Sequence, residues 1–281
     1  MCKDCGCEQI NEKKNSLLFS QNPSQHIHLH AHHLHEHEHE HEHEHEHEHE
    51  HEHHSKLTQQ SSSRKIEVEH NILQKNEDIA QKNRQWFDQH HIQVLNLMSS
   101  PGSGKTALLE KTLPLITAKY RTTVLVGDQQ TNYDALRLAE KGAAVKQINT
   151  YTSCHLDASM IARELGSFVK EETQLLFIEN IGNLVCPAAF HLGEHYKIAV
   201  FSVTEGEDKP AKYPVLFHEA DLVVLTKCDL IPYLDWDQRK FESNLFALNP
   251  DVPVIPLSAK TNQGIDLWIK YLDSLQESLC A

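Results

Sequence analysis

Residues 99–106 (SSPGSGKT) constrain the fold of this chain more than any other segment. They follow the apolar run 92–98 (IQVLNLM) and precede an amphipathic stretch at 106–118. The segment matches the pattern G-x-x-x-x-G-K-[ST] except at its first position, where Ser99 replaces glycine. A loop of this kind requires a buried strand before it and a helix N-terminus after it. The sequence therefore predicts a strand–loop–helix unit that cradles phosphate.

Short apolar runs alternate with amphipathic stretches along the rest of the chain. The predicted strands lie at 92–98, 122–127, 175–180, 198–203, 221–226 and 252–257. The predicted helices lie at 106–118, 133–141, 157–170, 237–247 and 264–276. Several strands are apolar throughout, which is typical of strands covered on both faces. We therefore expect a doubly wound α/β fold with a mainly parallel sheet.

The first 63 residues differ in composition from the remainder. They contain few apolar residues, so a disordered N-terminal region at 1–63 is expected. An α/β domain is expected at 64–281, opened by a helix at 64–89. Apolar residues recur every seven positions along that helix, namely Ile66, Ile72, Leu73, Ile79, Ala80, Trp86 and Phe87. This stripe predicts that the helix packs against the domain that follows it.

Charge and hydropathy narrow the class of protein. The 281-residue chain carries a formal net charge of −14, and nine of its acidic residues lie in a His-Glu tract at 35–54. An acidic chain of this kind is a poor candidate for nucleic-acid binding. No apolar run approaches the roughly 20 residues of a membrane span. The N-terminus also lacks the apolar core of a signal peptide. We expect a cytoplasmic protein without a membrane or nucleic-acid partner.

Seven cysteines are spaced unevenly along the chain: Cys2, Cys5, Cys7, Cys154, Cys186, Cys228 and Cys280. Their number is odd, and three of them crowd into the first seven residues. Thiols stay reduced in the cytoplasm. The clusters therefore predict metal binding or catalysis before disulfides.

The glycine-rich loop supplies the phosphate-contacting groups. Gly102 and Gly104 allow the backbone to curl so that its N–H groups face phosphate oxygens. The following helix presents its positive N-terminal end to the same anion. Lys105 can reach the β- and γ-phosphates, and the Thr106 hydroxyl can ligate Mg²⁺. The nucleotide-contacting residues expected here are Ser100, Pro101, Gly102, Ser103, Gly104, Lys105 and Thr106.

Two other strand ends carry candidate carboxylates. The strand FIENIG (177–182) ends in Glu179, with Gly182 three residues later. This resembles the D-x-x-G element of GTPases, whose carboxylate holds Mg²⁺ and whose glycine amide contacts the γ-phosphate. Asp128 could be a second carboxylate that holds Mg²⁺ or positions water, although a strand-end aspartate is equally a turn or cap residue. The candidate catalytic residues are Lys105, Thr106, Asp128 and Glu179.

Two later segments predict recognition of guanine. LTKCDL (225–230) resembles the N-K-x-D motif, with Thr226 in place of asparagine. Asp229 would accept hydrogen bonds from guanine, and the Lys227 stem would cover the base. LSAK (257–260) matches the loop that contacts guanine O6, which adds Ser258, Ala259 and Lys260 to the expected site. In this order and at strand ends, the motifs predict that GTP and GDP are the nucleotides.

A group of thiol and imidazole side chains lies outside these nucleotide motifs. Cys154 and His155 are adjacent, and Cys186 follows Gly182 by four residues. Thiolate and imidazole suit Zn²⁺, Ni²⁺ and copper. Because Cys186 lies just after the expected γ-phosphate contact, movement of Gly182 would displace it. A fourth ligand would come from water, another side chain or a second subunit. His191 and His195 are spaced for chelation only if that segment is helical.

A second thiol cluster lies at the N-terminus. Cys2, Cys5 and Cys7 share one short loop with Gly6, and thiolates so close repel each other unless a cation holds them. If Met1 is removed, the Cys2 amine adds a nitrogen ligand, and such an S₃N set suits Ni²⁺ or Zn²⁺.

These features together resemble the family of hydrogenase nickel-incorporation GTPases called HypB. The resemblance rests on the C-x-x-C-G-C start, the His-rich insert, the N-terminal helix, NLMSSPGSGKT, GDQQT, CHLDA, ENIGNLVCP and KCDL. It implies a P-loop GTPase of the SIMIBI class that dimerises when GTP is bound. It implies a high-affinity Ni²⁺ site at Cys2, Cys5 and Cys7 and a weaker Ni²⁺ or Zn²⁺ site at Cys154, His155 and Cys186. The implied partners are a small zinc-containing nickel metallochaperone and the [NiFe]-hydrogenase large-subunit precursor.

The His-Glu tract has two interpretations in this setting. Neutral imidazoles can ligate divalent cations, and the interleaved carboxylates attract them. A strand would line all the histidines on one face, and a helix would place them at i, i+4. We interpret the tract as a nickel reservoir, with a solvated spacer as the alternative.

Two other functions compete with a GTP-hydrolysing nickel metallochaperone. A nickel storage protein with a vestigial nucleotide site would not need Lys105, Thr106, Glu179 and Asp229, all of which are present. A urease-type nickel GTPase would carry a Cys-Pro-His element, whereas Ala188 follows Cys186 and Pro187 here.

Overall fold

The structure is a computed structural model that describes residues 54–129, 132–150 and 153–277, with side chains from residue 70 onward. The chain divides into two units, 1–70 and 71–281. Of the first unit, only the start of helix α2 (His54–Gln89) is described, and this helix begins before the expected residue 64. The N-terminal cysteines and the His-Glu tract up to residue 53 lie outside the described residues.

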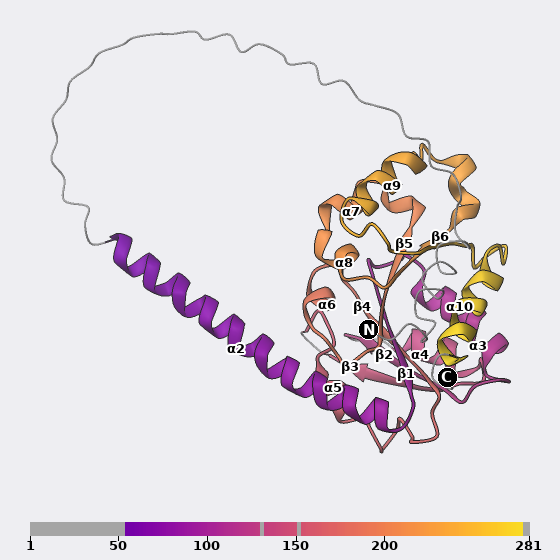
Figure 1. Ribbon diagram of the computed structural model, residues 1–281, viewed down its shortest axis with the longest axis horizontal. Coiled ribbons are helices and arrows are strands. Elements are labelled where there is room, and N and C mark those ends of the chain that lie inside the picture. The colour runs from indigo at the N-terminus through magenta and orange to yellow at the C-terminus, as the bar shows by residue number, and fades with distance from the viewer. Residues whose placement is uncertain (1–53, 130–131, 151–152, 278–281) are drawn as a thin grey trace, which may run out of the picture. The chain divides into compact units, whose positions relative to one another are not determined.

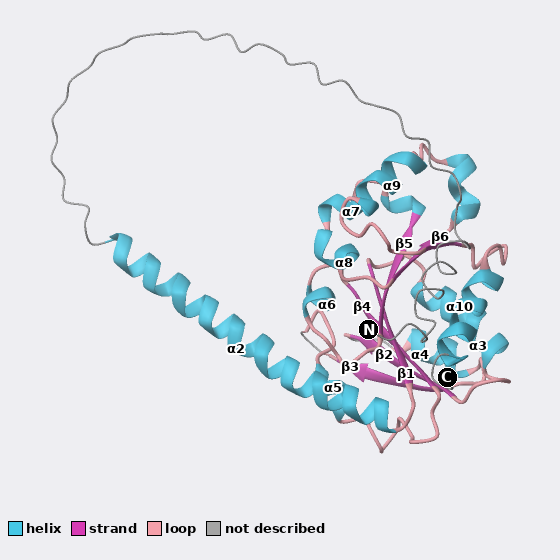
Figure 2. Cartoon of the chain, in the orientation of Figure 1, coloured by secondary structure: helices cyan, strands magenta, loops and turns pink. Residues whose placement is uncertain are grey.

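Seven strands form one sheet in the second unit (Figure 1; Figure 2). They are β1 (Gln93–Ser99), β2 (Thr122–Asp128), β3 (Ala144–Asn149), β4 (Leu175–Gly182), β5 (Tyr196–Ser202), β6 (Leu222–Thr226) and β7 (Val254–Pro256). Their order is β3-β2-β4-β1-β5-β6-β7, and every neighbouring pair is parallel. The predicted doubly wound parallel sheet is confirmed, with β1 at its centre.

Helices connect the strands. They are α3 (Lys105–Ile116), α4 (Tyr133–Ala139), α5 (Ala158–Ala162), α6 (Cys186–Ala189), α7 (Lys209–Lys212), α8 (Pro214–His218), α9 (Gln238–Phe246) and α10 (Ile265–Glu277). The predicted helix 157–170 is wrong beyond its first turn. Helix α5 ends at Ala162, and the chain then turns through Gly166, whose φ of +72° is incompatible with continuing the helix.

Successive strand residues point to opposite faces of the sheet. Residues of both sets are buried, so both faces are covered. On one face, Leu95 belongs to a core cluster with helices α3 and α10, including the fully buried Trp268. On the other face, Val94 clusters with Phe87 of α2, and Met98 clusters with residues of α8 and α9. The apolar runs in the sequence therefore correspond to strands buried on two sides.

Helix α2 is joined to the domain near its C-terminal end. Ala80 and Phe87 are buried, as the apolar stripe predicts. Ile72 and Leu73 of the same stripe are 51% and 41% exposed. The stripe therefore packs at Ala80 and Phe87, whereas Ile72 and Leu73 remain accessible. Neither α2 nor any other described helix is both long and apolar enough to cross a membrane.

The strand order determines where a ligand can bind. From β1 the chain runs to β2, β3 and β4 on one side, and the connection from β4 then passes β1 to reach β5, β6 and β7 on the other side. In open parallel sheets, ligands bind beyond the carboxyl ends of strands at such a switch point. The 99–106 loop leaves β1 at this point.

Candidate functional site

The phosphate-binding loop joins β1 to α3. Gly102 and Gly104 have positive φ angles of 74° and 102°, which glycine adopts without strain. The loop is closed internally, since the Ser103 hydroxyl donates to the Ser100 carbonyl over 3.0 Å. Helix α3 begins at Lys105 directly after the loop. The predicted loop residues 100–104 thus form one curl at a helix N-terminus, a geometry suited to an anion.

Lys105 is 8% exposed and turns back toward β1. Its ammonium donates to the Ser99 hydroxyl over 2.5 Å. Burial lowers the pKa of Lys105, and the nearby Glu179 carboxylate opposes that shift. The departure from the glycine-loop pattern at Ser99 therefore has a structural role, because the hydroxyl is a hydrogen-bond partner for this lysine.

Thr106 and Glu179 meet beside the loop. The Thr106 hydroxyl donates to Glu179 Oε1 over 2.6 Å, while Glu179 Oε2 is buried and has no hydrogen-bond partner among the described residues. Burial raises the pKa of Glu179 to about 7, against the hydrogen bond from Thr106 and the charge of Lys105. A buried carboxylate oxygen beside a hydroxyl suits a hard divalent cation, so these residues fit Mg²⁺.

Gly182 ends β4, the strand beside β1, and Asp128 ends β2, the next strand beyond β4. Asp128 is the last residue of β2, two positions beyond Val126, which pairs with Glu179. Gly182 is paired with Ser99, and a Cβ atom at Gly182 would lie 2.9 Å from backbone atoms of Pro101. Because real Cβ atoms do not approach backbone so closely, only glycine fits here. The strand end that carries Glu179 is therefore in direct contact with the phosphate loop.

The segments expected to read guanine meet on the other side of the loop. The Lys227 ammonium donates to the Gly102 carbonyl over 2.8 Å, and the Thr226 hydroxyl lies 2.5 Å from the Ser103 carbonyl. Thr226 thus binds the phosphate loop, even though it replaces the asparagine of the motif. The Ser258 hydroxyl donates to Asp229 Oδ1 over 2.6 Å.

The 257–260 loop is only partly available for a base. The Ser258 N–H donates to the Gln263 carbonyl over 2.9 Å, and the Ser258 hydroxyl is already used by Asp229. Ala259 and Lys260 follow in the turn, and Lys260 is exposed. We therefore assign Ser258 to positioning Asp229, with Ala259 and Lys260 nearer to solvent.

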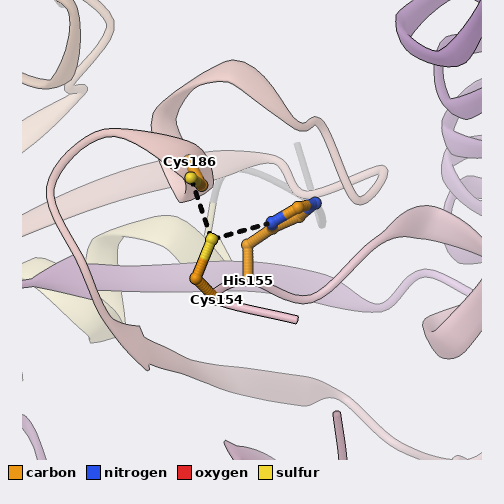
Figure 3. Close-up of side chains that lie close together, drawn as sticks. All are labelled: Cys154, His155 and Cys186. Carbon is orange, nitrogen blue, oxygen red and sulfur yellow. Dashed lines mark hydrogen bonds between the residues drawn. The ribbon is translucent and has the colours of Figure 1, made fainter. Parts of the chain in front are cut away.

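Cys154, His155 and Cys186 lie together, as Figure 3 shows. Their ligand atoms are all within 4.8 Å of one another. The Cys154 thiol points to Cys186 Sγ at 3.0 Å and lies 3.7 Å from His155 Nδ1. All three side chains are half-buried. Within the part of the chain that the structure describes, this is the one such group of potential metal ligands.

The environment of this cluster favours neutral ligands. The hydrogen bond from Cys154, together with burial, raises the pKa of the Cys186 thiol. Burial lowers the pKa of His155, against the charge of Asp157, and so keeps the imidazole unprotonated near neutral pH. The His155 ring packs against Phe190 with centroids 4.0 Å apart and the ring planes tilted by 34°.

His191 and His195 have other partners. His195 Nδ1 accepts from the Val94 N–H over 3.1 Å, and its Nε2 lies 2.9 Å from Asp88 Oδ1. His191 Nε2 lies 3.2 Å from the ammonium of Lys197. The segment is a loop rather than a helix, and its two histidines serve separate contacts.

Three residues of the site are not identified by the sequence analysis. Ser99 binds Lys105, and Glu205 accepts a hydrogen bond from the Ser100 hydroxyl and another from the Ser202 N–H. The Ser-x-x-Glu spacing at 202–205 is a capping-box signature that could have drawn attention to Glu205. Asn180, between Glu179 and Gly182, makes buried contacts that have no sequence signature.

Comparison with known proteins agrees with this geometry. Residues 93–256 match the family described as CobW/HypB/UreG, nucleotide-binding domain. The chain belongs to this family. The CobW/HypB/UreG match spans the sheet from β1 to β7, including the phosphate loop, the cysteine–histidine cluster and the Lys227 segment.

Individual relatives are similar over most of the domain. The hydrogenase maturation factor HypB of Azotobacter vinelandii is 49% identical over 213 residues, which are 76% of this chain and 70% of that protein. Two solved structures are 36% identical: HypB from Archaeoglobus fulgidus (TM-score 0.68, 72% of this chain and 98% of that one) and HypB from Helicobacter pylori in complex with nickel (TM-score 0.67, 73% and 96%). This chain and these HypB proteins thus share the fold of the CobW/HypB/UreG nucleotide-binding domain.

Proposed function

We propose that the chain is a GTP-hydrolysing nickel metallochaperone that stores nickel and delivers it for maturation of the [NiFe]-hydrogenase large subunit. The observation that carries the proposal is the cluster of Cys154, His155 and Cys186, of which Cys186 lies four residues after Gly182 of the nucleotide site. The similarity to proteins named hydrogenase maturation factor HypB and to a HypB structure in complex with nickel supports the same assignment.

The phosphate loop is proposed to hold the β- and γ-phosphates of GTP. The backbone amides of residues 100–104 would face the phosphate oxygens, and Lys105 would leave Ser99 to reach them. Thr106 and Glu179 would hold Mg²⁺, which supplies positive charge to the phosphate oxygens. Asp128, at the end of the neighbouring strand, would orient the water that attacks the γ-phosphate.

Guanine would be selected by Asp229. Its carboxylate can accept two hydrogen bonds from the N1 and N2 groups of guanine, which adenine does not offer. Ser258 holds Asp229 in place through the 2.6 Å hydrogen bond, and Lys227 lies along the loop with its ammonium on Gly102. This support restricts Asp229 to one orientation, which favours discrimination between bases.

Nickel is the proposed cargo of the cluster. Two thiolates and one imidazole suit Ni²⁺, and Zn²⁺ uses the same ligands. Cys186 starts α6 four residues beyond Gly182, so a shift of Gly182 toward a γ-phosphate would move one ligand relative to the other two. GTP and GDP would thus give the cluster different metal affinities.

The N-terminal region is proposed to be the store. Cys2, Cys5 and Cys7 would form a tighter nickel site, and the His-Glu tract would hold further ions weakly. The proposed assembly includes a GTP-dependent homodimer, a small zinc-containing nickel metallochaperone that hands over nickel, and the hydrogenase large-subunit precursor that receives it.

Nickel titration of the full chain tests the proposal. The protein is titrated with Mg²⁺-GDP and with a Mg²⁺-bound non-hydrolysable GTP analogue, beside a variant with Cys2, Cys5 and Cys7 changed to serine. We expect the variant to retain, beside weak binding by the His-Glu tract, about one tighter nickel per subunit or per dimer, with an affinity that depends on the nucleotide. A variant with no nickel site tighter than the tract, with either nucleotide, would refute the gated cluster. A chain without GTP turnover would instead be a nickel store.

A further inference from the structure

A buried asparagine, supported by two further buried polar side chains, joins the strand end of the nucleotide site to the segment that carries Cys154 and His155. We name the residues Asn180, Asn96 and Glu194 the amide relay. Asn180 lies on β4 directly after Glu179, and Asn96 lies at the centre of β1. They are 1% and 0% exposed, and Glu194 is 6% exposed. None of these residues has a part in the nucleotide or metal chemistry proposed above.

Asn180 binds two segments at once. Its Oδ1 accepts from the Leu156 N–H over 3.2 Å and from the Ile181 N–H over 3.0 Å. Leu156 directly follows the ligands Cys154 and His155, while Ile181 lies between Glu179 and Gly182. One amide oxygen therefore joins the strand end at the phosphate loop to the segment that carries two of the three metal ligands.

The rest of the relay fixes the orientation of Asn180. Its Nδ2 donates to Asn96 Oδ1 over 3.2 Å, and Asn96 Nδ2 donates to Glu194 Oε1 over 3.1 Å. Glu194 Oε2 in turn accepts from the Leu192 N–H over 2.6 Å. Because each amide group has a committed partner, Asn180 cannot rotate without leaving buried polar groups unpaired, which is unfavourable in a protein interior.

This arrangement restricts how the two sites can move. A displacement of Glu179 and Gly182 carries Asn180 with it, since Asn180 lies between them in the same strand. The Leu156 N–H must then follow Asn180 or lose its partner in the core. A second, longer contact joins the same segments, from Asn183 Nδ2 to the Cys154 carbonyl at 3.5 Å. The buried contact of Asn180 is the shorter and more enclosed of the two.

We propose that Asn180 is a positioning residue that couples the nucleotide state to the placement of Cys154 and His155. This inference rests on the proposed function for nucleotide binding. Cys186 responds through the chain that follows Gly182, whereas Cys154 responds through the hydrogen bond from Leu156 to Asn180. Through these two connections, Cys186 on one segment and Cys154 with His155 on the other can change position together.

Thiol alkylation tests the coupling without any metal. Full-length protein, stripped of metal by a chelator and dialysed, is treated with N-ethylmaleimide in Mg²⁺-GDP or a Mg²⁺-bound non-hydrolysable GTP analogue. Peptide mass spectrometry follows Cys154, Cys186 and the buried Cys228 as an internal reference. In the wild type we expect the rates at Cys154 and Cys186 to differ at least about fivefold between nucleotides, the lower end of typical coupling.

The variants Asn180→Ala and Asn180→Ser remove the acceptor for the Leu156 N–H. We expect the Cys154 ratio to fall to within about twofold of one, while Cys186 keeps its response. A merely structural role would lower both ratios or neither. The matched control is Asn249→Ala, because the Asn249 amide donates to the carbonyls of Phe217, His218 and Ala220, outside both sites. It should lower thermal stability and leave both ratios unchanged.

The outcomes separate this inference from the proposed function. A wild-type response at Cys154 in either folded variant overturns the role of Asn180, as does a wild-type Cys154 rate that ignores the nucleotide. Asn180→Ser serves if Asn180→Ala does not fold. Nickel titration of the untreated wild type reports on the function alone. Failure to bind GTP, or a nickel affinity that ignores the nucleotide, refutes the proposed function, whereas the Cys154 ratios of the variants decide the role of Asn180.

Discussion

The nucleotide site and the metal cluster are built in different ways. In the nucleotide site, side chains at the start of α3 already hold side chains on buried strands: Lys105 binds Ser99, and Thr106 binds Glu179. In the cysteine–histidine cluster, three half-buried potential ligands come from two connecting segments, and their closest contact is the 3.0 Å approach of two thiols. The first site is held by the sheet and α3, and the second by a loop and the first residue of the short helix α6.

This difference shows how a single domain can combine a fixed site with an adjustable one. Side chains on strands and helices keep their positions more closely than side chains on loops. A small change at the rigid strand end can therefore be taken up by the loops that carry Cys154 and Cys186. The comparison predicts large, local effects for changes in the nucleotide site and graded effects for changes in the cluster.

The largest expected effect is on hydrolysis in Lys105→Ala. Loss of the ammonium should slow GTP turnover by about 10²–10³-fold, because charge on the γ-phosphate loses a positioned cation. The number of nickel ions bound, including those at the N-terminal cysteines, should stay the same. The matched control is Lys111→Ala, an exposed lysine of the same helix. A loss of bound nickel in Lys105→Ala would show that the two sites are not separable.

A second prediction concerns the pH dependence of stability through Glu179. Its pKa of about 7 is raised above the ordinary 4.5, so the folded state prefers the protonated carboxyl. Stability is therefore lost as pH rises from about 4.5 to about 7, because the unfolded chain releases this proton first. Glu179→Gln should match the wild type near pH 5 and exceed it by roughly 3 kcal/mol at pH 8.

Denaturant unfolding without nucleotide or Mg²⁺ measures this difference across pH 5 to 8. Lys105, Asp134 and Arg137, the other charges acting on Glu179, are present in both proteins. Equal pH dependence of the wild type and Glu179→Gln would mean that the carboxylate is solvated or paired at neutral pH. That result would weaken the view that the nucleotide site is rigid and dry.

A third prediction addresses the adjustable site. Cys186→Ser should weaken nickel binding at the cluster by about 10–100-fold, since a hydroxyl is a poor substitute for a thiolate. GTP turnover should be altered much less. Cys228→Ser is the control, because that buried thiol donates to the Leu225 carbonyl and a hydroxyl can do the same. Competition with a metal-binding dye in a background lacking the N-terminal cysteines gives the affinities. Equal affinities in the two variants would exclude Cys186 as a ligand.

The smallest expected effect is in Thr226→Val. The variant keeps the shape of the side chain and removes the hydroxyl that lies 2.5 Å from the Ser103 carbonyl. Unfolding free energy should fall by about 1 kcal/mol, and GTP affinity should fall by less than about tenfold. Calorimetric titration with GTP distinguishes support of the phosphate loop by Thr226 from direct contact between Thr226 and the nucleotide. A much larger loss of affinity would place Thr226 against the nucleotide itself.

Most of the fold could be predicted because its strands are apolar throughout. Strand β3 could not, since it lies at the edge of the sheet and carries Lys146, Gln147 and Asn149 on a largely accessible surface. The predicted helix 157–170 failed because Phe168 and Val169 continue an apolar pattern while Gly166 turns the chain. The spacing of apolar residues indicates which residues are buried, and a buried turn can show the same spacing as a helix.

The candidate site could be predicted as far as its motifs extend. The sequence predicts that Cys154, His155 and Cys186 share a metal, and the structure brings them together, although their binding of nickel remains to be tested. The sequence does not indicate that the Ser99 hydroxyl binds the Lys105 ammonium or that the Asn180 side chain joins two segments. Hydroxyls and amides bind many partners, so their contacts depend on packing between elements distant in the sequence.

The central position of β1 has a consequence for synthesis of the chain. Gln93 pairs with Leu175, 82 residues later, and Leu95 pairs with Tyr196, 101 residues later. At about 5–20 residues per second, the second neighbour of β1 leaves the ribosome roughly 5–20 s after β1 itself. Until β4 emerges the apolar strand β1 has no partner on either edge, and until β5 emerges one of its edges stays open. Translation that stops before the end of β5 therefore yields an aggregation-prone fragment rather than a smaller folded protein.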